Sequence, residues 1–141
     1  MNKDVVNELN NFLKGQYIGI HQYERLIQHT KDPYIRSELQ KIQQDHKLHA
    51  IMVAERIQNL GGTAVDGAGL KGTIADTMSR LKGTDNDINE IINQAVKGES
   101  MGINASVELV KGDLDFESKK IVEDILNTDK GHIEHLNNLL H

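Results

Sequence analysis

The sequence predicts an all-α protein: a four-helix bundle of two antiparallel hairpins joined by a long crossover. Three observations support this fold class. The 141 residues include one proline, no cysteine, no tryptophan and only 4% aromatic residues, a composition typical of helical proteins. Apolar residues recur at alternating steps of three and four along four long segments, as in bundle packing. The chain also matches itself without gaps at a fixed offset, which indicates a duplicated helical hairpin.

The repeat contains residues with metal-binding chemistry. Residues 14–16 (KGQ) correspond to residues 97–99 (KGE), and residues 46–49 (HKLH) correspond to residues 129–132 (DKGH). Each half therefore has a hydrogen-bonding side chain well upstream of two polar side chains that lie three positions apart. In a bundle made of two such hairpins, both sets would lie near the middle of the core.

The first two helices are expected over Lys3–His29 and Pro33–Leu60. The first should stop before Asp32-Pro33, because aspartate caps a helix and proline is favoured in its first turn. The second should stop at Gly61-Gly62, a signal for a helix end. Since only a few residues join the two helices, they should be antiparallel neighbours.

The second hairpin is expected from Asp85 onward. Its first helix should run to Lys111, and its second should follow Gly112-Asp113 and continue to Leu140. The glycine-rich residues 61–84 form the crossover, with a short helix expected over Thr73–Leu81. The length of this connection allows it to cross the bundle. We expect residues 1–141 to form a single domain.

Six polar residues occupy core-facing positions where leucine or isoleucine is expected: Gln16, His46, His49, Glu99, Asp129 and His132. Burying such groups without partners costs on the order of a few kcal/mol each. One economical solution is that they surround a metal ion, because side chains three residues apart on a helix point the same way. Their donor types suit iron, manganese or zinc. The alternative is a buried hydrogen-bond network that binds no metal.

Neighbouring polar residues are interpreted as structural. Tyr23 is assigned to core packing, and Asp45 to the solvent-facing side of its helix. His135, one turn beyond His132, is the one additional histidine that could reach the site. If Glu99 and Asp129 are both charged, they should repel each other in the absence of metal.

These residues also carry a resemblance to the ferritin-like superfamily, and to its bacterioferritin and rubrerythrin branches. Residues 13–23 (LKGQYIGIHQY) resemble a first-helix motif with Gln16 at the position of a ligating glutamate. Residues 45–50 (DHKLHA) resemble the second-helix pattern D-E-x-x-H-A, with His46 at the glutamate. Residues 128–136 (TDKGHIEHL) are similar to the fourth-helix pattern, with Asp129 at the glutamate. Glu99 falls where the third helix carries its ligand.

The resemblance implies a ferritin-like metal-binding protein of iron handling or oxidative-stress defence, with iron storage as one expected role. Such families hold two irons with four carboxylates and two histidines, whereas only Glu99 and Asp129 are carboxylates here. The expected cofactor is therefore one or two iron ions, with zinc or manganese as alternatives. No haem is expected, because Lys47 takes the place of the haem-ligating methionine.

Activity and partners follow from the same resemblance. The replaced glutamates weaken the expectation of ferroxidase activity, for which O₂ or peroxide would be the partner. Two other functions stay open: a non-catalytic stress or assembly bundle that has lost the di-iron site, and a mononuclear-metal oxidase or peroxidase. A homo-oligomer is expected. The net charge of −5 and the lack of a basic run argue against nucleic acid. Without a signal peptide or a long apolar run, we expect a cytoplasmic protein that does not bind membranes.

Overall fold

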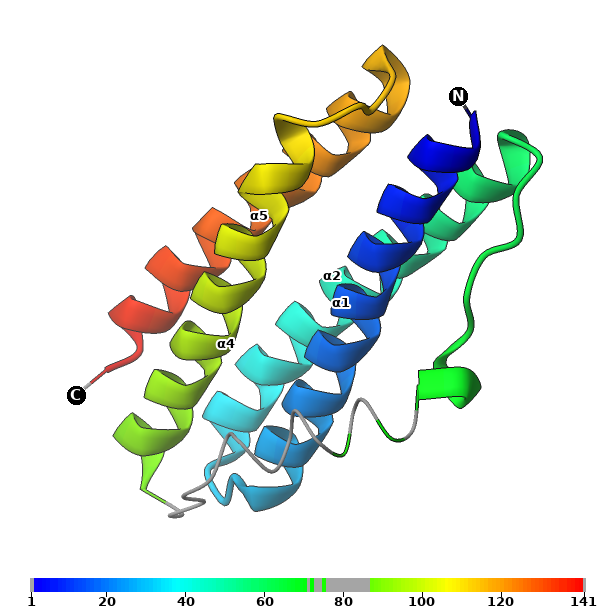
Figure 1. Ribbon diagram of the computed structural model, residues 1–141. Coiled ribbons are helices and arrows are strands. Elements are labelled where there is room, and N and C mark those ends of the chain that lie inside the picture. The colour runs from blue at the N-terminus through cyan, green and yellow to red at the C-terminus, as the bar shows by residue number, and fades with distance from the viewer. Residues whose placement is uncertain (1, 71, 73–74, 76–86, 141) are drawn as a thin grey trace.

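The computed structural model describes residues 2–70, 72, 75 and 87–140 (Figure 1). These residues form four long helices and a short 3₁₀ helix, and they contain no strand: α1 (Asn2–His29), α2 (Pro33–Asn59), η1 (Gly67–Leu70), α4 (Ile88–Val110) and α5 (Phe116–Asn138). The two hairpins, α1 with α2 and α4 with α5, lie side by side, with α1 next to α4 and α2 next to α5. The predicted all-α class is confirmed.

The helix ends follow the predicted signals and lie within one turn of the predicted positions. The Asp32 side chain caps α2 by accepting hydrogen bonds from the backbone N–H of Tyr34 at 2.9 Å and of Ile35 at 3.1 Å. Gly61 follows the end of α2 with a φ of 84°, a left-handed conformation that favours glycine. The short helix predicted over Thr73–Leu81 lies almost wholly on residues that the structure does not describe.

The apolar core of the bundle has two parts. The first cluster, at the end of the bundle where α1 begins, includes Leu9, Leu13, Val53, Ile57 and Val122. The second cluster, at the opposite end, includes Tyr23, Leu26, Leu39, Ile92 and Leu136. The six polar residues predicted from the repeat lie between the two clusters along every helix, and each is at most 8% exposed. They form a buried polar layer across the middle of the bundle.

An ionic contact joins the two hairpins at one end. The Arg56 guanidinium, in the last turn of α2, donates to Asp115 Oδ2 at 2.6 Å and to Ser118 Oγ at 3.0 Å, and it lies 2.9 Å from Glu117. Asp115 in turn caps α5 by accepting from the Ser118 backbone N–H at 3.3 Å. The start of α5 is thereby fixed against the end of α2. None of the described helices combines the length and apolar character needed to cross a membrane.

Candidate metal centre

The structure brings the predicted residues together from all four long helices. Gln16 comes from α1, Glu99 from α4, and the two histidine-containing pairs from α2 and α5, where a spacing of three places both side chains on one face. A tight group can be defined within this layer: His46, Glu99, Asp129 and His132 each offer one donor atom, and these atoms lie within 4.8 Å of one another. All four residues are buried.

Glu99 is the hub of the hydrogen bonds in this layer. Its Oε1 accepts from the Tyr23 hydroxyl at 2.7 Å, and it lies 2.6 Å from His46 Nε2 and 3.4 Å from His132 Nδ1. Burial disfavours the charged carboxylate, but hydrogen bonds from His132, His46 and Tyr23 outweigh that effect and lower the pKa of Glu99 to about 2. Glu99 is therefore ionised at neutral pH.

His132 is oriented by a partner at the surface. Its Nε2 lies 2.8 Å from Oδ2 of Asp45, a side chain that is 46% exposed. Its Nδ1 faces inward, 3.4 Å from Glu99 Oε1 and 3.5 Å from Asp129 Oδ1. Burial alone would lower the pKa of His132, but the neighbouring carboxylates of Asp129, Glu99 and Asp45 raise it to about 10. In the metal-free protein this imidazole is therefore a cation held among carboxylates.

Three buried polar atoms in the layer make no hydrogen bond of good geometry: His49 Nδ1, Asp129 Oδ1 and His132 Nδ1, the last two of which face each other as a long ion pair. Asp129 Oδ1 lies 4.0 Å from His49 Nδ1 and 3.5 Å from His132 Nδ1. Tetrahedral ligands about 2.1 Å from one ion lie roughly 3.4 Å apart, so these spacings fit a shared cation. Burial lowers the pKa of His49, which keeps this imidazole neutral, the form that binds metal.

The other side of the layer is already paired. His46 uses both ring nitrogens, with Nε2 toward Glu99 at 2.6 Å and Nδ1 3.3 Å from Gln16 Oε1. Its ring stacks on Tyr23 with centroids 5.4 Å apart. Gln16 thus contacts His46 and lies outside the tight group. This half of the layer matches the alternative interpretation from the sequence, a buried hydrogen-bond network that binds no metal. The half around Asp129 instead contains the atoms that make no hydrogen bond of good geometry.

Two residues of the site were not predicted. Tyr23 packs in the core as expected, but it also donates to Glu99. Asp45 is half-exposed, yet it holds His132 across the bundle. The position of Tyr23 on the core face, two turns after Gln16, was a signal in the sequence that it could reach the site. Asp45 gave no local signal, because its partner His132 lies 87 residues away on another helix. His135 does not join the group: its Nε2 lies 3.2 Å from Glu38 Oε1.

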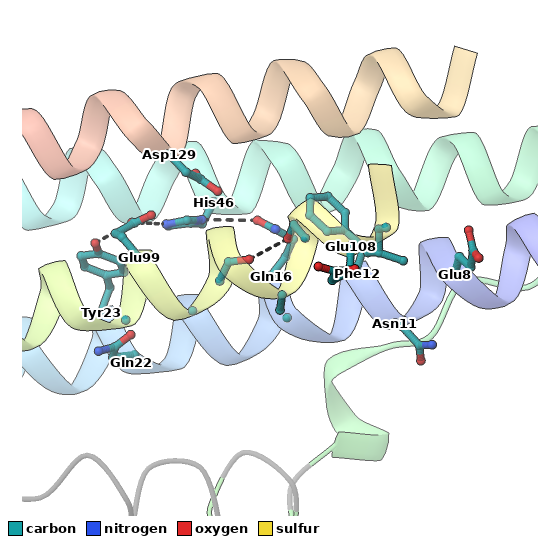
Figure 2. A pocket seen from close by; sticks show the side chains of 17 residues that line it. Glu8, Asn11, Phe12, Gln16, Gln22, Tyr23, His46, Glu99, Glu108 and Asp129 are labelled. Carbon is teal, nitrogen blue, oxygen red and sulfur yellow. Dashed lines mark hydrogen bonds and ion pairs between the residues drawn. The ribbon is translucent and has the colours of Figure 1, made fainter. Parts of the chain in front are cut away.

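A cavity of about 370 Å³ lies between α1 and α4 and reaches this layer. Figure 2 shows Tyr23, Glu99 and His46 at one end of the view and Glu8 at the other. Gln16, His46, Glu99 and Asp129 all line the cavity. The site can therefore be reached from the α1–α4 side of the bundle.

Comparisons with known proteins bear on the family and on the fold. A family described as a domain of unknown function (DUF2383) matches residues 4–112. That span includes Gln16, His46, His49 and Glu99 but ends before the two site residues of α5. Among curated proteins no match is found.

Solved structures share the fold at low sequence identity. A dodecameric thioferritin, the bacterioferritin-related protein of Bacteroides fragilis, superposes with a TM-score of 0.80 and 22% identity, covering 98% of this chain and 84% of that one. A ferritin-like diiron-carboxylate protein of Bacillus anthracis gives 0.71 and 21%, with 99% and 97% covered. The ferritin-like part of a two-domain protein from Anabaena variabilis gives 0.78 and 18%, with 99% of this chain and 36% of that one covered. These likenesses show that the bundle is ferritin-like, as the motifs predicted.

Proposed function

The chain belongs to the DUF2383 family, whose description assigns no activity, and we propose from the site itself that this protein binds a transition-metal ion at the centre of its ferritin-like bundle. The proposed ligands are Glu99, Asp129 and His132 of the tight group, together with His49. His49 lies outside that group, but its Nδ1 makes no hydrogen bond and lies 4.0 Å from Asp129 Oδ1. His46 belongs to the group, but both of its ring nitrogens already have contacts, one of them with Gln16. Iron is the proposed physiological ion, and zinc and manganese suit the same donor set.

The observation that carries this proposal is the convergence of three unsatisfied atoms. Leaving a buried donor or acceptor without a partner costs about 1–3 kcal/mol, and buried polar atoms in native proteins are nearly always paired. Here His49 Nδ1, Asp129 Oδ1 and His132 Nδ1 all lack a hydrogen bond of good geometry, and Asp129 Oδ1 lies 4.0 Å from His49 Nδ1 and 3.5 Å from His132 Nδ1. One cation would satisfy all three atoms.

The surrounding residues prepare the site for a cation. His49 is neutral and can donate its lone pair directly. Asp45 keeps a proton on His132 Nε2, so that Nδ1 is the nitrogen that faces the site once its own proton leaves. Glu99 is ionised and is fixed by Tyr23. A bound iron ion would supply one-electron redox chemistry at a position that the α1–α4 cavity connects to solvent.

Charge favours one tightly held ion. Glu99 and Asp129 together balance a single divalent ion, whereas two such ions would carry twice the charge of these ligands. A second ion would have to use His46 and Gln16, which already contact each other at 3.3 Å. We therefore propose a mononuclear site, with any second ion bound more weakly.

The named neighbours support iron handling as the role. The Bacteroides protein is a dodecameric thioferritin and the Bacillus protein a diiron-carboxylate protein. By analogy we propose a homo-oligomer active in iron storage or oxidative-stress defence, with O₂ or peroxide as the reactant. A second candidate is a bundle that uses the polar layer only for structure, which the short His46–Glu99 contact of 2.6 Å favours.

Metal analysis decides between the two candidates. Protein purified without added metal is measured by elemental analysis and native mass spectrometry, and is then melted with and without zinc, manganese or anaerobic ferrous iron. We expect one ion per chain and a higher melting temperature. Asp129→Asn should lower affinity at least tenfold, and the exposed Asp124→Asn on the same helix is the matched control. A melting temperature indifferent to all three metals at neutral pH would favour the structural network.

A further inference from the structure

The cavity between α1 and α4 is long and narrow, with carboxylates at both ends. Its lining runs from Glu8 to Tyr23 on α1 and from Gly98 to Leu109 on α4. A helix rises about 1.5 Å per residue, so this stretch of α1 spans roughly 20 Å. A volume of about 370 Å³ spread over that length leaves a mean cross-section of roughly 20 Å². Such a space fits a single extended chain better than a branched or bulky molecule.

Two buried carboxylates, Glu99 and Asp129, form the inner pair at one end of the cavity. Both line the cavity, and each residue is 5% exposed. The hydroxyl and the two imidazoles around Glu99 all contact its Oε1, so Oε2 is the oxygen left for a ligand. Asp129 Oδ1 makes no hydrogen bond of good geometry. The His132 imidazolium offsets one of the two charges but does not line the cavity, so a net negative charge faces the cavity.

Two further carboxylates, Glu8 on α1 and Glu108 on α4, form the outer pair toward the other end. Glu8 Oε2 is buried and makes no hydrogen bond. A Cβ placed on Gly112, one turn beyond Glu108, would lie 3.2 Å from Glu8 Oε1, so both carboxylates lie beside the same end of α4. Figure 2 shows Glu8 at the opposite end of the view from Glu99. Lysine and arginine are absent from the lining residues that the structure describes, so the charge of the outer pair is not balanced along the described lining.

The cavity between the two pairs is largely apolar. A Cβ placed on Gly15, Gly19 or Gly102 would meet no atom within 4 Å, so these glycines border open space rather than a tightly packed helix contact. Phe12 and Leu109 supply apolar side chains. An aliphatic chain gains free energy by leaving water for such walls, whereas a hydrated metal ion does not. The ligand that fits is therefore apolar in its middle and positively charged at both ends.

The spacing of the two pairs sets the length of such a ligand. Nine positions separate Glu99 from Glu108, and eight separate Glu8 from Gln16 in the polar layer. At about 1.5 Å per residue, the two pairs lie roughly 12–14 Å apart along the bundle. An extended peptide spans about 3.6 Å for every three backbone bonds, so about nine bonds of an extended aliphatic chain span roughly 11 Å. Two ammonium groups separated by such a chain could each lie at hydrogen-bond distance from one carboxylate pair.

We propose that this cavity binds a linear aliphatic diamine or polyamine, whose terminal ammonium groups contact the inner and outer pairs and whose methylene chain lies against Gly102 and Phe12. The inference goes beyond the proposed function and does not depend on it, because both charged ends of the site are carboxylates of the chain itself. It also has a consequence for metal. An ammonium group on the inner pair and a metal ion need the same oxygens, so each should weaken the binding of the other.

The test uses the metal-free protein with 1,8-diaminooctane as the probe. Octylamine, which has one ammonium group, and 1,4-diaminobutane, which is too short to span the two pairs, are the matched controls. Calorimetry should show one diaminooctane per chain and at least tenfold weaker binding of both controls, because a hydrogen bond to a charged group is lost with each. The double variant Glu8→Gln with Glu108→Gln should bind diaminooctane no more tightly than octylamine. The exposed Glu55→Gln on α2 should bind like the parent.

A measurement on the parent protein covers the case in which the double variant does not fold. Nuclear Overhauser contacts should join the methylene groups of diaminooctane to Phe12 and Leu109. Equal binding of diaminooctane and octylamine would refute the contact at two ends, and a lack of diaminooctane binding would refute the inference as a whole.

Zinc separates this inference from the proposed function. Diaminooctane should bind the zinc-loaded protein at least tenfold more weakly than the metal-free protein, because zinc occupies the inner pair. Unchanged binding to the zinc-loaded protein would refute the contact with the inner pair. If diaminooctane binds but zinc does not, the inference stands and the proposed function fails. If zinc binds but diaminooctane does not, the proposed function stands and the inference fails.

Discussion

Metal and proton should compete for His132, because the metal-free site already holds a positive charge there. The imidazole lies between Glu99 and Asp129 with Asp45 behind it, and these groups raise its pKa to about 10. A metal ion needs the lone pair of Nδ1, so binding at neutral pH must release the Nδ1 proton to solvent. A free imidazole has a pKa of about 6.5 and would release no proton at pH 8.

The size of this competition follows from the pKa. The pKa of His132 is about 10, so pH 7 lies about three units below it. The proton on His132 therefore reduces the apparent metal affinity at pH 7 roughly a thousandfold, or about 4 kcal/mol, relative to a deprotonated site. Affinity should therefore rise about tenfold for each pH unit between pH 6.5 and 9. Below about pH 6.5, other groups begin to compete as well and the slope should become steeper.

Zinc titrations at several pH values, each in two buffers of different ionisation enthalpy, measure both the slope and the number of protons released. We expect close to one proton per ion from His132. His132→Gln should bind more weakly and lose the slope above pH 6.5, while the exposed His21→Gln should behave as the parent. A zinc affinity that is constant from pH 7 to 9, with no proton release, would show that His132 is not charged in the metal-free protein or is not a ligand.

Three further predictions concern stability and geometry. Because the folded pKa of His132 is raised, its stabilising effect is complete below about pH 6.5 and should be lost as the pH rises toward 10, so the metal-free protein should melt at progressively lower temperature over that range. Asp45→Asn, which removes the charged partner of His132 Nε2, should lower zinc affinity about 10–100-fold in calorimetry. It should also slightly lower the stability of the metal-free protein at neutral pH, because Asp45 is one of the groups that raise the pKa of His132. Gly98→Ala should destabilise the protein by about 1–3 kcal/mol in urea unfolding, because the added Cβ would overlap the buried Gln22 amide. Gly102→Ala should be neutral or stabilise the protein by about 1 kcal/mol, because its Cβ would meet no atom within 4 Å and alanine favours the helix.

Each of these has a clear contrary result. A melting temperature that rises between pH 6.5 and 9 in the absence of metal would contradict the charged His132. Unchanged zinc affinity in Asp45→Asn would mean that other contacts orient the ring. Equal stability of Gly98→Ala and Gly102→Ala would show that the close approach of Gln22 to α4 is not maintained in solution.

The fold and the position of the polar layer could be predicted because both depend on local patterns. The Asp32 cap and the glycine at position 61 mark helix ends within a few residues of themselves. Polar residues in apolar stripes identify the buried layer, because their spacing places them on the face that packs. The sequence repeat further predicts that the polar residues of the two hairpins lie at the same height along the bundle.

The details of pairing could not be predicted, because they depend on which helices approach and how closely. The sequence suggests that Glu99 and Asp129 would repel each other without metal, yet the structure inserts the His132 imidazole between them. Asp45 belongs to the site only because α5 brings His132 to it. The cavity arises because α1 and α4 leave space beside their glycines, whereas the same glycines could equally have allowed the helices to pack closely.

The division of the core into two apolar clusters separated by the polar layer has a consequence for how the helices align. Sliding one helix by a turn would bring leucine or isoleucine into the layer and force a carboxylate or imidazole into an apolar cluster. Each such exchange would leave a buried charge without its partner, at a cost on the order of several kcal/mol. Apolar clusters alone would tolerate such a shift, because one leucine replaces another. The polar layer therefore fixes the register of all four helices, and it would do so even in the absence of metal.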